Sequence, residues 1–448
     1  MNINAIRNIY FLGIGGIGMS ALARFFVQQG AHVSGYDRTP TSLTRDLEMM
    51  GITIHYEENT ELLPANLDLA VYTPAIPAES IELKHLIDSG IPVVKRARLL
   101  AELTKDHFTI AVVGTHGKTT ITSIITHILI SAGIPVTAFI GGIANNFQSN
   151  FVHRQGSKIM VVEADEFDQS FLQLTPDIAV VSSMDADHLD IYQEHGSLMG
   201  AYQNFVNRIK LNGHLVVREG VVLTTDNKST HYGLNPDADV FADEIQVQNG
   251  KFSFEIHSIH GDKCAVQWLI PGRHNIENAL AAVSAGLILG ISLDRLCASL
   301  GTYLGVKRRF EFRICQPDLC FIDDYAHHPE ELKACIGAAR ELFPGKRITG
   351  VFQPHLFSRT RDFMNEFAQS LSMLDEVLLL DIYAAREMPI NGISSAELLK
   401  RIPSDNKWLV SREKIIETIV GLKPEVLLTL GAGDIDLLVE PIEKALTQ

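Results

Sequence analysis

The chain has 448 residues, which at roughly 100 to 200 residues per domain predicts about three domains. Apolar residues make up 46% and charged residues 20%, so the composition is that of a globular protein and excludes a disordered or fibrous one. With 38 basic and 53 acidic residues the net charge is −15, which disfavours nucleic acid or an anionic membrane surface as a partner unless basic residues gather locally.

The cysteine pattern and the N-terminus indicate a cytoplasmic protein. Five cysteines without a C-x-x-C pair favour reduced thiols over a disulfide scaffold or a thiolate zinc site. The opening MNINAIRNIYFLGIGG lacks the apolar core of an export signal. The uncharged apolar run Ala279–Leu293 is shorter than the roughly 20 residues that span a bilayer, so we expect a buried helix and no membrane insertion. A monomer and a homodimer both remain open.

Apolar, strand-like runs alternate with helical patterns along the chain. This alternation predicts α/β domains with parallel sheets covered by helices on both faces. The first set is a strand, a helix and two further strands, at Asn8–Leu12, Met19–Gln29, His32–Tyr36 and Leu69–Tyr72. A charged amphipathic helix, Arg96–Lys105, then precedes a new apolar strand. We therefore predict a Rossmann-like N-terminal domain over residues 1–105.

The turn after the first strand matches the pattern G-x-G-x-x-G, and Asp37 ends the second strand. Glycines in such a turn let the backbone approach a diphosphate, and the acidic residue accepts hydrogen bonds from ribose hydroxyls. NAD and a nucleotide sugar such as a UDP compound both carry this group. The predicted diphosphate site consists of Gly13, Gly15, Gly16, Ile17, Gly18 and Asp37.

A second glycine-rich turn lies between the apolar strand Phe108–Val113 and a helix. Its backbone N–H groups and the helix N-terminus can bind phosphate, while Lys118 reaches the terminal phosphates and the Thr119 hydroxyl completes a Mg²⁺ shell. It departs from the general P-loop spacing because Val112, not glycine, stands six residues before Lys118. The predicted site for ATP or GTP consists of Gly114, Thr115, His116, Gly117, Lys118, Thr119 and Thr120.

Acidic loops follow the next two apolar strands. Glu163 is the first residue after Lys158–Val162, where a nucleotide-binding sheet places a carboxylate for Mg²⁺. His188 lies among carboxylates after Ile178–Ser183 and could bind a second divalent ion, although a solvated loop histidine is equally compatible with the spacing. The predicted ligands of Mg²⁺ or Mn²⁺ are Thr119, Glu163 and His188.

Two further features lie at the end of this central part. Asn275 and Asn278 are three residues apart at a helix start, where amides can bind a purine edge; helix capping is the alternative for Asn275. Basic residues Lys307 to Arg309 mark a boundary, so we predict a central P-loop domain over residues 106–306 and a C-terminal Rossmann-like domain over residues 307–448. An arginine there could act as an arginine finger or be merely solvated.

The C-terminal domain is predicted to carry strands whose ends lead into loops rich in His, Arg and Asp. Open α/β sheets bind ligands at this edge. The loops include Asp324, one of the candidate catalytic residues, and Arg359, whose guanidinium could bind a small carboxylate bidentately. The strands are expected at Leu319–Ile322, Ile348–Phe352, Glu376–Leu380 and Val426–Leu430.

Ten segments along the whole chain together resemble the Mur ligase family of peptidoglycan precursor synthesis. They are GIGGIGMSALA, GTHGKTT, EADE-x-D-x-SFL, DADHLD-x-Y, GRHN-x-x-NALAA, RRFE, DDYAHHPEEL, FQPH-x-FSRTRDF, DIYAARE and GAGDI. The resemblance implies three domains, for the UDP-sugar, for ATP and for the incoming amino acid. It also implies amide formation through an acyl phosphate, and assigns the first glycine-rich loop to a UDP diphosphate.

Within the family, the opening resembles members that join L-alanine to the lactyl carboxylate of UDP-N-acetylmuramate. The resemblance implies that Lys118 and Arg309 stabilise the transferring phosphoryl and that the amino acid is positioned by His327, His328, His355 and Arg359. Leu356 stands where some members have Arg, so Arg359 would hold the carboxylate with less help. The stretch 201–205 lacks the metal-bridging lysine of later Mur ligases.

Three alternatives remain open at this point. A related ligase recycles a whole tripeptide onto UDP-N-acetylmuramate, although its first loop reads differently. An NAD-dependent oxidoreductase would explain the first glycine-rich loop but not the Lys118 loop. A non-catalytic nucleotide switch would explain the Lys118 loop but not the His- and Arg-rich C-terminal loops.

Overall fold

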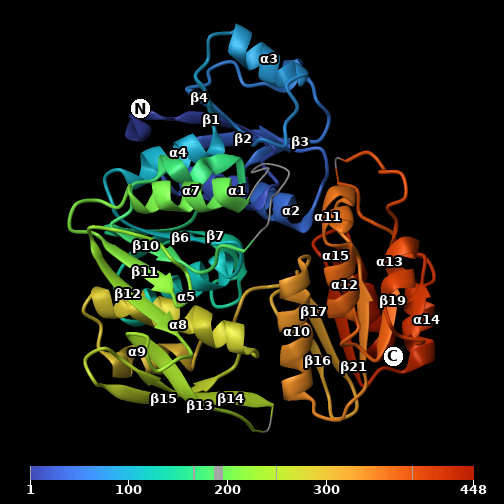
Figure 1. Cartoon of the computed structure of the whole chain (residues 1–448). Coiled ribbons are helices and arrows are strands. Elements are labelled where there is room, and N and C mark those ends of the chain that lie inside the picture. Colours follow the sequence, from blue (N-terminus) through green and yellow to red (C-terminus); the bar gives the residue numbers. More distant parts are fainter. Residues whose placement is uncertain (1, 165–166, 186–194, 249, 386, 448) are drawn as a thin grey trace. The chain divides into compact units, whose positions relative to one another are not determined.

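The computed structural model is a mixed α/β structure with three sheets, which confirms the predicted fold class (Figure 1). It describes residues 2–164, 167–185, 195–248, 250–385 and 387–447. The chain folds into two compact units. The first comprises Met1–Phe241, His257–Cys264 and Asn278–Tyr303, and the second comprises Ala242–Ile256, Ala265–Glu277 and Leu304–Gln448.

The first sheet is fully parallel, with strand order β3-β2-β1-β4-β5. Its strands are β1 (Asn8–Leu12), β2 (His32–Tyr36), β3 (Thr53–His55), β4 (Leu69–Tyr72) and β5 (Val93–Lys95). The strands predicted at β1, β2 and β4 have the predicted bounds. The accompanying helices are η1 (Ile3–Ala5), α1 (Ile17–Gln28), α2 (Ser42–Met49), η2 (Thr60–Leu62), α3 (Ile81–Asp88) and α4 (Arg96–Thr104).

The second sheet has the strand order β15-β14-β13-β12-β11-β10-β6-β9-β7-β8. Its strands are β6 (Phe108–Val113), β7 (Val136–Ala144), β8 (Ser149–His153), β9 (Ile159–Glu163), β10 (Ile178–Val181), β11 (His214–Arg218), β12 (Lys228–Gly233), β13 (Val240–Gln248), β14 (Lys251–His257) and β15 (Lys263–Trp268). β6, β9 and β10 are parallel neighbours, so their carboxyl ends meet at one edge. β7 and β8 pair antiparallel, unlike the all-parallel prediction.

The helices of this part are α5 (Lys118–Ser131), η3 (Phe167–Gln173), α7 (His195–Val206), α8 (Arg273–Ile288) and α9 (Leu293–Leu300). The uncharged run expected to form one buried helix is divided between α8 and α9. Gly290 lies between them with φ +79°, a left-handed conformation that an α-helix does not continue through. Helix α1 packs against β7 and β8, so the first two sheets share a core in the first unit.

The third sheet lies in the second unit, with order β16-β17-β21-β18-β19-β20. Its strands are β16 (Glu311–Cys315), β17 (Cys320–Asp324), β18 (Ile348–Phe352), β19 (Glu376–Leu379), β20 (Lys407–Leu409) and β21 (Val426–Leu430). All pair in parallel except β16, which is antiparallel to β17. The helices are α10 (Pro329–Leu342), α11 (Phe357–Asp362), α12 (Met364–Leu371), α13 (Ser395–Arg401), α14 (Ile415–Leu422) and α15 (Asp436–Thr447).

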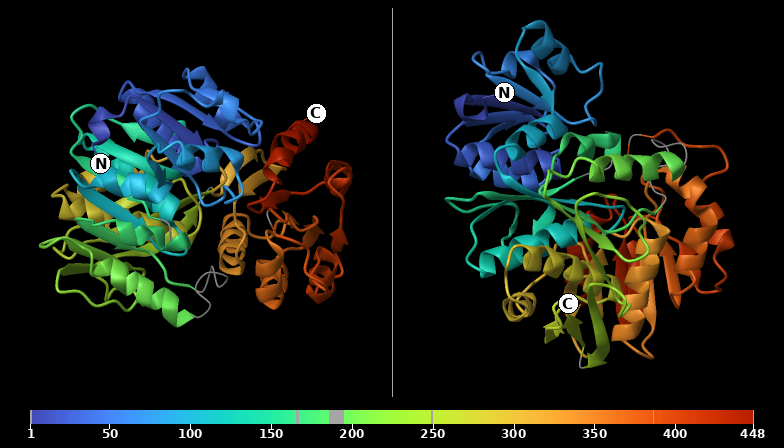
Figure 2. Two further views of the ribbon diagram at one scale, coloured as in Figure 1. Left: turned by 90° about the horizontal axis from the view of Figure 1, so that it is seen from above. Right: turned by 60° about the vertical axis from the view of Figure 1, so that its left-hand side comes forward.

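Helices cover both faces of the third sheet (Figure 2). Val351 of β18 packs in a cluster with Ile419 of α14 and Leu438 of α15. The next residue, Phe352, points to the opposite face, where its ring lies 5.4 Å from that of Phe367 in α12. Among the helices that the structure describes, none is long and apolar enough to cross a membrane.

Candidate active site

The Lys118 loop joins β6 to α5 and has the geometry of a phosphate-binding turn. Gly114 and Gly117 adopt φ +137° and +83°, which side chains rarely adopt. A Cβ on Gly114 would lie 2.1 Å from Ser182 Oγ, so the turn also requires the absence of a side chain. Gly117 is the N-cap of α5 and offers no side-chain acceptor, so the first N–H groups of the helix can donate to an anion.

The loop is held by the segment that follows β10. The Thr115 hydroxyl donates to the carbonyl of Asp185 at 2.9 Å, and the His116 backbone N–H donates to Ser183 Oγ at 3.0 Å. The Ser182 hydroxyl donates to the carbonyl of His116. The sequence reasoning missed these two serines as supports of the loop, although their place at the end of a strand parallel to β6 offered a signal.

Lys118 is the first residue of α5 and lies over the loop. Its Nζ donates to the carbonyl oxygens of Gly114 at 2.6 Å and Thr115 at 3.3 Å. The next two residues, Thr119 and Thr120, are largely buried at the start of the helix. The loop therefore combines a cation, hydroxyls and backbone N–H groups in one turn.

Glu163 lies at the carboxyl end of β9, with Val112 of β6 as its strand partner. Its Oε2 accepts a hydrogen bond from the Gly141 backbone N–H at 2.9 Å. A Cβ on Gly141 would lie 2.2 Å from that same oxygen, so the position of the carboxylate depends on a glycine in β7. His188, the remaining predicted metal ligand, lies outside the described residues.

The first glycine-rich loop is organised by Asp37. The Gly15 N–H donates to Asp37 Oδ2 at 2.8 Å, and the Thr39 N–H donates to Asp37 Oδ1 at 3.1 Å. Gly13 adopts φ +81°. Gly16 is the N-cap of α1 and offers no side-chain acceptor, so this helix also begins with N–H groups that can face an anion.

A cavity of about 260 Å³ connects this loop with Glu163. Gly16, Ile17 and Gly18 line it from the start of α1, and Gly141 and Glu163 line it from β7 and β9 of the second sheet. Arg96, at the start of α4, adds a cation to the wall. A Cβ added to Gly18 would lie 2.8 Å from Arg96 Nη1, so the guanidinium packs closely against this glycine. Arg96 was missed in the sequence because it belongs to the charged helix that we read only as a domain boundary.

The two predicted asparagines are both buried on α8 but contact different groups. Asn275 donates from Nδ2 to the carbonyl of Pro271 at 2.7 Å, a local bond of the capping kind. A Cβ added to Gly117 would lie 2.4 Å from Asn278 Oδ1, so the Asn278 amide packs directly against the phosphate-binding turn. The contact at Asn278 is the one expected of a nucleotide-site residue.

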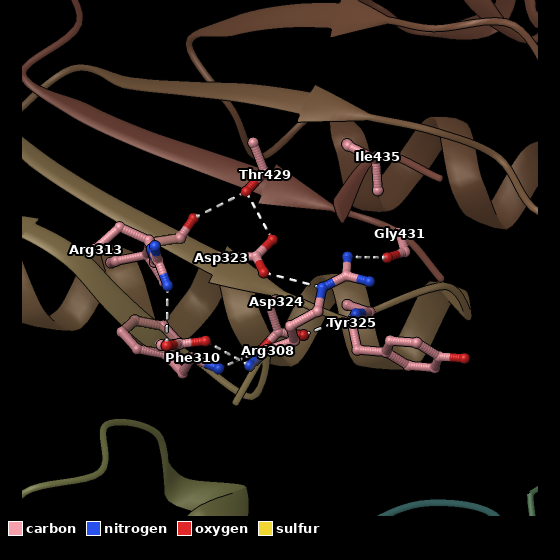
Figure 3. Close-up of polar contacts among 12 residues, drawn as sticks. Arg308, Phe310, Arg313, Asp323, Asp324, Tyr325, Thr429, Gly431 and Ile435 are labelled. Carbon is pink, nitrogen blue, oxygen red and sulfur yellow. Dashed lines mark hydrogen bonds and ion pairs between the residues drawn. The ribbon is translucent and has the colours of Figure 1, made fainter. Parts of the chain in front are cut away.

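In the second unit, Arg308 and Asp323 tie the ends of β17 and β21 together (Figure 3). Arg308 donates from Nε to Asp323 Oδ2 at 2.9 Å and from Nη2 to the carbonyl of Gly431 at 2.7 Å. Asp324 accepts backbone N–H bonds from Phe310 at 2.6 Å and Ala326 at 2.7 Å. Burial raises the pKa of Asp324 to about 6, against the opposing effects of the Arg309 charge and those two bonds.

Arg309 lies against Tyr325 and Glu331. Its guanidinium carbon is 5.2 Å from the Tyr325 ring centroid, and Nη1 is 3.7 Å from Glu331 Oε1. The same carboxylate, through Oε2, lies 3.2 Å from His327 Nδ1. Glu331 thus links the boundary arginine to the first of the predicted amino-acid-binding histidines.

The structure brings two of the three predicted histidines together. The His327 and His355 ring centroids are 6.1 Å apart, and His355 stacks on Tyr383 at 5.7 Å. Arg359 is largely buried on α11, shortly after His355 in the chain. His328 instead caps α10: its Nδ1 accepts from the Glu330 N–H at 3.4 Å, and its ring lies 4.8 Å from that of Phe363.

These features are those expected of a nucleotide-binding α/β enzyme. Three family models match successive parts of the chain: the Mur ligase family catalytic domain at residues 8–108, the Mur ligase middle domain at residues 112–286, and the Mur ligase glutamate ligase domain at residues 308–433. The chain belongs to the Mur ligase family.

Full-length relatives are similar to the chain from end to end. The UDP-N-acetylmuramate–L-alanine ligase of Flavobacterium psychrophilum is 46% identical over 452 residues, covering 100% of both chains. The Porphyromonas gingivalis W83 protein of the same name is 42% identical and covers 98% of this chain and 99% of its own length. Among solved structures, the UDP-N-acetylmuramate–alanine ligase of Thermotoga maritima has a TM-score of 0.83 at 26% identity, with 98% of each chain covered.

A murein peptide ligase from Psychrobacter arcticus shares the fold, with a TM-score of 0.75 at 23% identity over 98% of each chain. Similarity in fold therefore extends to a ligase with a different name.

Proposed function

We propose that the chain joins L-alanine to the lactyl carboxylate of UDP-N-acetylmuramate, using ATP and releasing ADP and phosphate. The observation that carries this proposal is the cavity shared by the first glycine-rich loop and Glu163. A UDP-sugar held at Gly13 to Gly18 by its diphosphate would extend through this cavity, so that its carboxylate approaches the nucleotide site. The names of the full-length relatives support the same substrates.

In the first step, one oxygen of the lactyl carboxylate attacks the γ-phosphoryl of ATP, the bond to the β-phosphate oxygen breaks, and an acyl phosphate and ADP form. The phosphates lie on the N–H groups of the Gly114 to Thr120 turn, and Lys118 stabilises the charge on the transferring group. Arg96 balances the negative charge of the UDP-sugar. We retain Arg309 as a second cation for this step, and Asn278 as a nucleotide contact.

The donor set of the nucleotide site fits Mg²⁺, because a Thr hydroxyl and a carboxylate are hard oxygen ligands. Thr119 and Glu163 would hold the ion, with His188 as a further predicted ligand. When bound, the ion neutralises charge on the transferring phosphoryl group. Mn²⁺ prefers the same oxygen ligands.

In the second step, the amine of L-alanine attacks the acyl carbonyl, phosphate leaves, and the nitrogen loses a proton to give the amide. The proposed acceptor site lies at the carboxyl edge of the third sheet. Arg359 would bind the carboxylate of the amino acid, while His327 and His355 lie near the amine. His328 would act indirectly, by holding α10 and with it His327.

We retain domain boundaries at residues 105 and 306, which give the UDP-sugar, ATP and the amino acid one sheet each. The decisive experiment is phosphate release from ATP with UDP-N-acetylmuramate and, in separate reactions, L-Ala, Gly, L-Ser and the recycled tripeptide. The proposal requires release with L-Ala. Release with the tripeptide alone would replace it by the recycling ligase, and nicotinamide-dependent absorbance changes would indicate an oxidoreductase.

A further inference from the structure

Cys315 and Cys320 face each other across the antiparallel strands β16 and β17. They are direct partners in the strand register, and both thiols are free. The hairpin turn between them contains Pro317 and Asp318, and it is closed by the bond from the Gln316 N–H to the carbonyl of Leu319 at 2.9 Å.

The hydrogen bonds identify the type of this cross-strand pair. Since Gln316 and Leu319 form a hydrogen-bonded pair, the next pair outward, Cys315 and Cys320, is a non-hydrogen-bonded one. The Cys320 N–H supports this assignment, because it donates to the carbonyl of Glu425 at 2.9 Å and therefore points away from β16. Partners in such a pair have Cα atoms about 4.5 Å apart and side chains on one face, which falls within the roughly 4.4 to 6.8 Å of protein disulfides.

The two thiols differ in environment. Cys315 is exposed on the edge strand, whereas Cys320 is 2% exposed. Burial, with Cys315 as a neighbour, raises the pKa of the Cys320 thiol to about 12. An oxidant therefore reaches Cys315 first, and Cys320 is placed to react with the product.

We propose that Cys315 and Cys320 are a modification site at which a peroxide oxidises the pair to a reversible disulfide. The Cys315 thiolate attacks a peroxide oxygen, so that an S–O bond forms, the O–O bond breaks and the departing hydroxide becomes water on protonation. Cys320 then attacks the sulfenic sulfur of Cys315: the S–S bond forms, the S–O bond breaks, and the proton of Cys320 leaves with the second water. Two thiols lose two electrons, which the peroxide gains.

The test uses the full chain treated with hydrogen peroxide, followed by alkylation of the remaining thiols, trypsin digestion and mass spectrometry. Trypsin cleavage after Arg313 and Lys333 leaves both cysteines in one peptide and Cys335 in another. We expect this peptide to be unalkylated and lighter by two hydrogen atoms, and to recover both alkylation sites after dithiothreitol. Cys335→Ser should leave the result unchanged.

A matched variant separates strand geometry from mere proximity in sequence. Combining Cys315→Ser with Gln316→Cys moves the first thiol by one residue, which turns it to the opposite face of the strand. This variant should show at least about a tenfold slower loss of alkylation at Cys320, the expected effect of removing a preorganised partner. Equal rates in the two proteins, or oxidation of Cys315 to sulfinic acid with Cys320 still alkylated, would overturn the proposal.

Discussion

The side-chain amide of Asn150 donates from Nδ2 to the carbonyl of Ile17 at 2.6 Å, linking β8 of the second sheet to the first glycine-rich loop. The same nitrogen lies 2.8 Å from Ser20 Oγ in α1. Asn150 is fully buried, and its Oδ1 has no partner within the described part of the chain. Because Ile17 lines the cavity that also contains Glu163, Asn150 fixes one wall of the proposed UDP-sugar site relative to the other.

Replacing Asn150 by Ala should raise the KM for UDP-N-acetylmuramate about fivefold, since the loop loses a buried hydrogen bond worth about 1 kcal/mol. The KM for ATP should stay within about twofold, because the Lys118 loop has its own supports. Asn146→Ala is a suitable control, because that amide lies in the same hairpin but donates to the carbonyl of Thr302. An equal change in both KM values would show that Asn150 has only a structural role.

Lys118→Ala should lower kcat for amino-acid-dependent phosphate release by roughly a thousandfold, because it removes the cation nearest the transferring phosphoryl. Lys158→Ala provides a comparison of the same chemical change at an exposed position outside the loop. A coupled phosphate assay with saturating substrates measures both. Near-normal turnover in Lys118→Ala would refute the assignment of this loop to ATP.

Gly141→Ala tests the placement of the Glu163 carboxylate. The new Cβ would lie 2.2 Å from Glu163 Oε2, so the carboxylate must move and lose its bond to the strand. We expect kcat/KM to fall at least about tenfold, as for a misplaced site group. Gly200→Ala, whose Cβ would meet nothing within 4 Å, should retain full activity. Wild-type kinetics in Gly141→Ala would exclude Glu163 from the site.

The pKa of Asp324 predicts a distinctive dependence of stability on pH. Its folded-state pKa of about 6 lies above the ordinary value of 3.8, so the protonated form is favoured in the folded state. The stability from this group is fully present below pH 3.8 and is lost as the pH rises through about 6. The free energy of unfolding of the wild type minus that of Asp324→Asn should therefore fall by roughly 2 kcal/mol between pH 4 and pH 7.

Denaturant unfolding at several pH values measures this difference. The variant also leaves one backbone N–H, of Phe310 or Ala326, facing an amide NH₂, but that cost is independent of pH and cancels from the slope. A pH-independent difference between the two proteins would show that Asp324 titrates normally.

The sequence predicted most reliably what depends on local pattern. The strands β1, β2, β4 and β6 have the expected bounds because short apolar runs are bounded there by turns and charged segments. The strand β16 and its antiparallel pairing with β17 were not predicted. Alternating polarity along a segment does not reveal which strand it pairs with or in which direction. The division between α8 and α9 was missed because Ile291 continues the apolar run past Gly290.

In the candidate site too, local motifs could be predicted from the sequence and contacts between distant segments could not. The glycines and Lys118 form motifs within a few consecutive residues, so their local spacing is visible in the sequence. Asn150 contacts Ile17 from 133 positions away, and Ser183 contacts His116 from 67 positions away. Contacts of this kind arise from strand order and helix packing, and no spacing rule along one chain predicts them.

The position of β16 at the edge of the third sheet has a consequence for solubility. An edge strand exposes unpaired backbone groups to which the strand of another molecule can add. Here the strand carries Arg313, which donates from Nε to Glu443 at 3.0 Å and from Nη1 to Glu311 at 3.2 Å. Charged side chains on an edge strand oppose such pairing. The ion pairs of β16 thus act against aggregation through this outer strand of the third sheet.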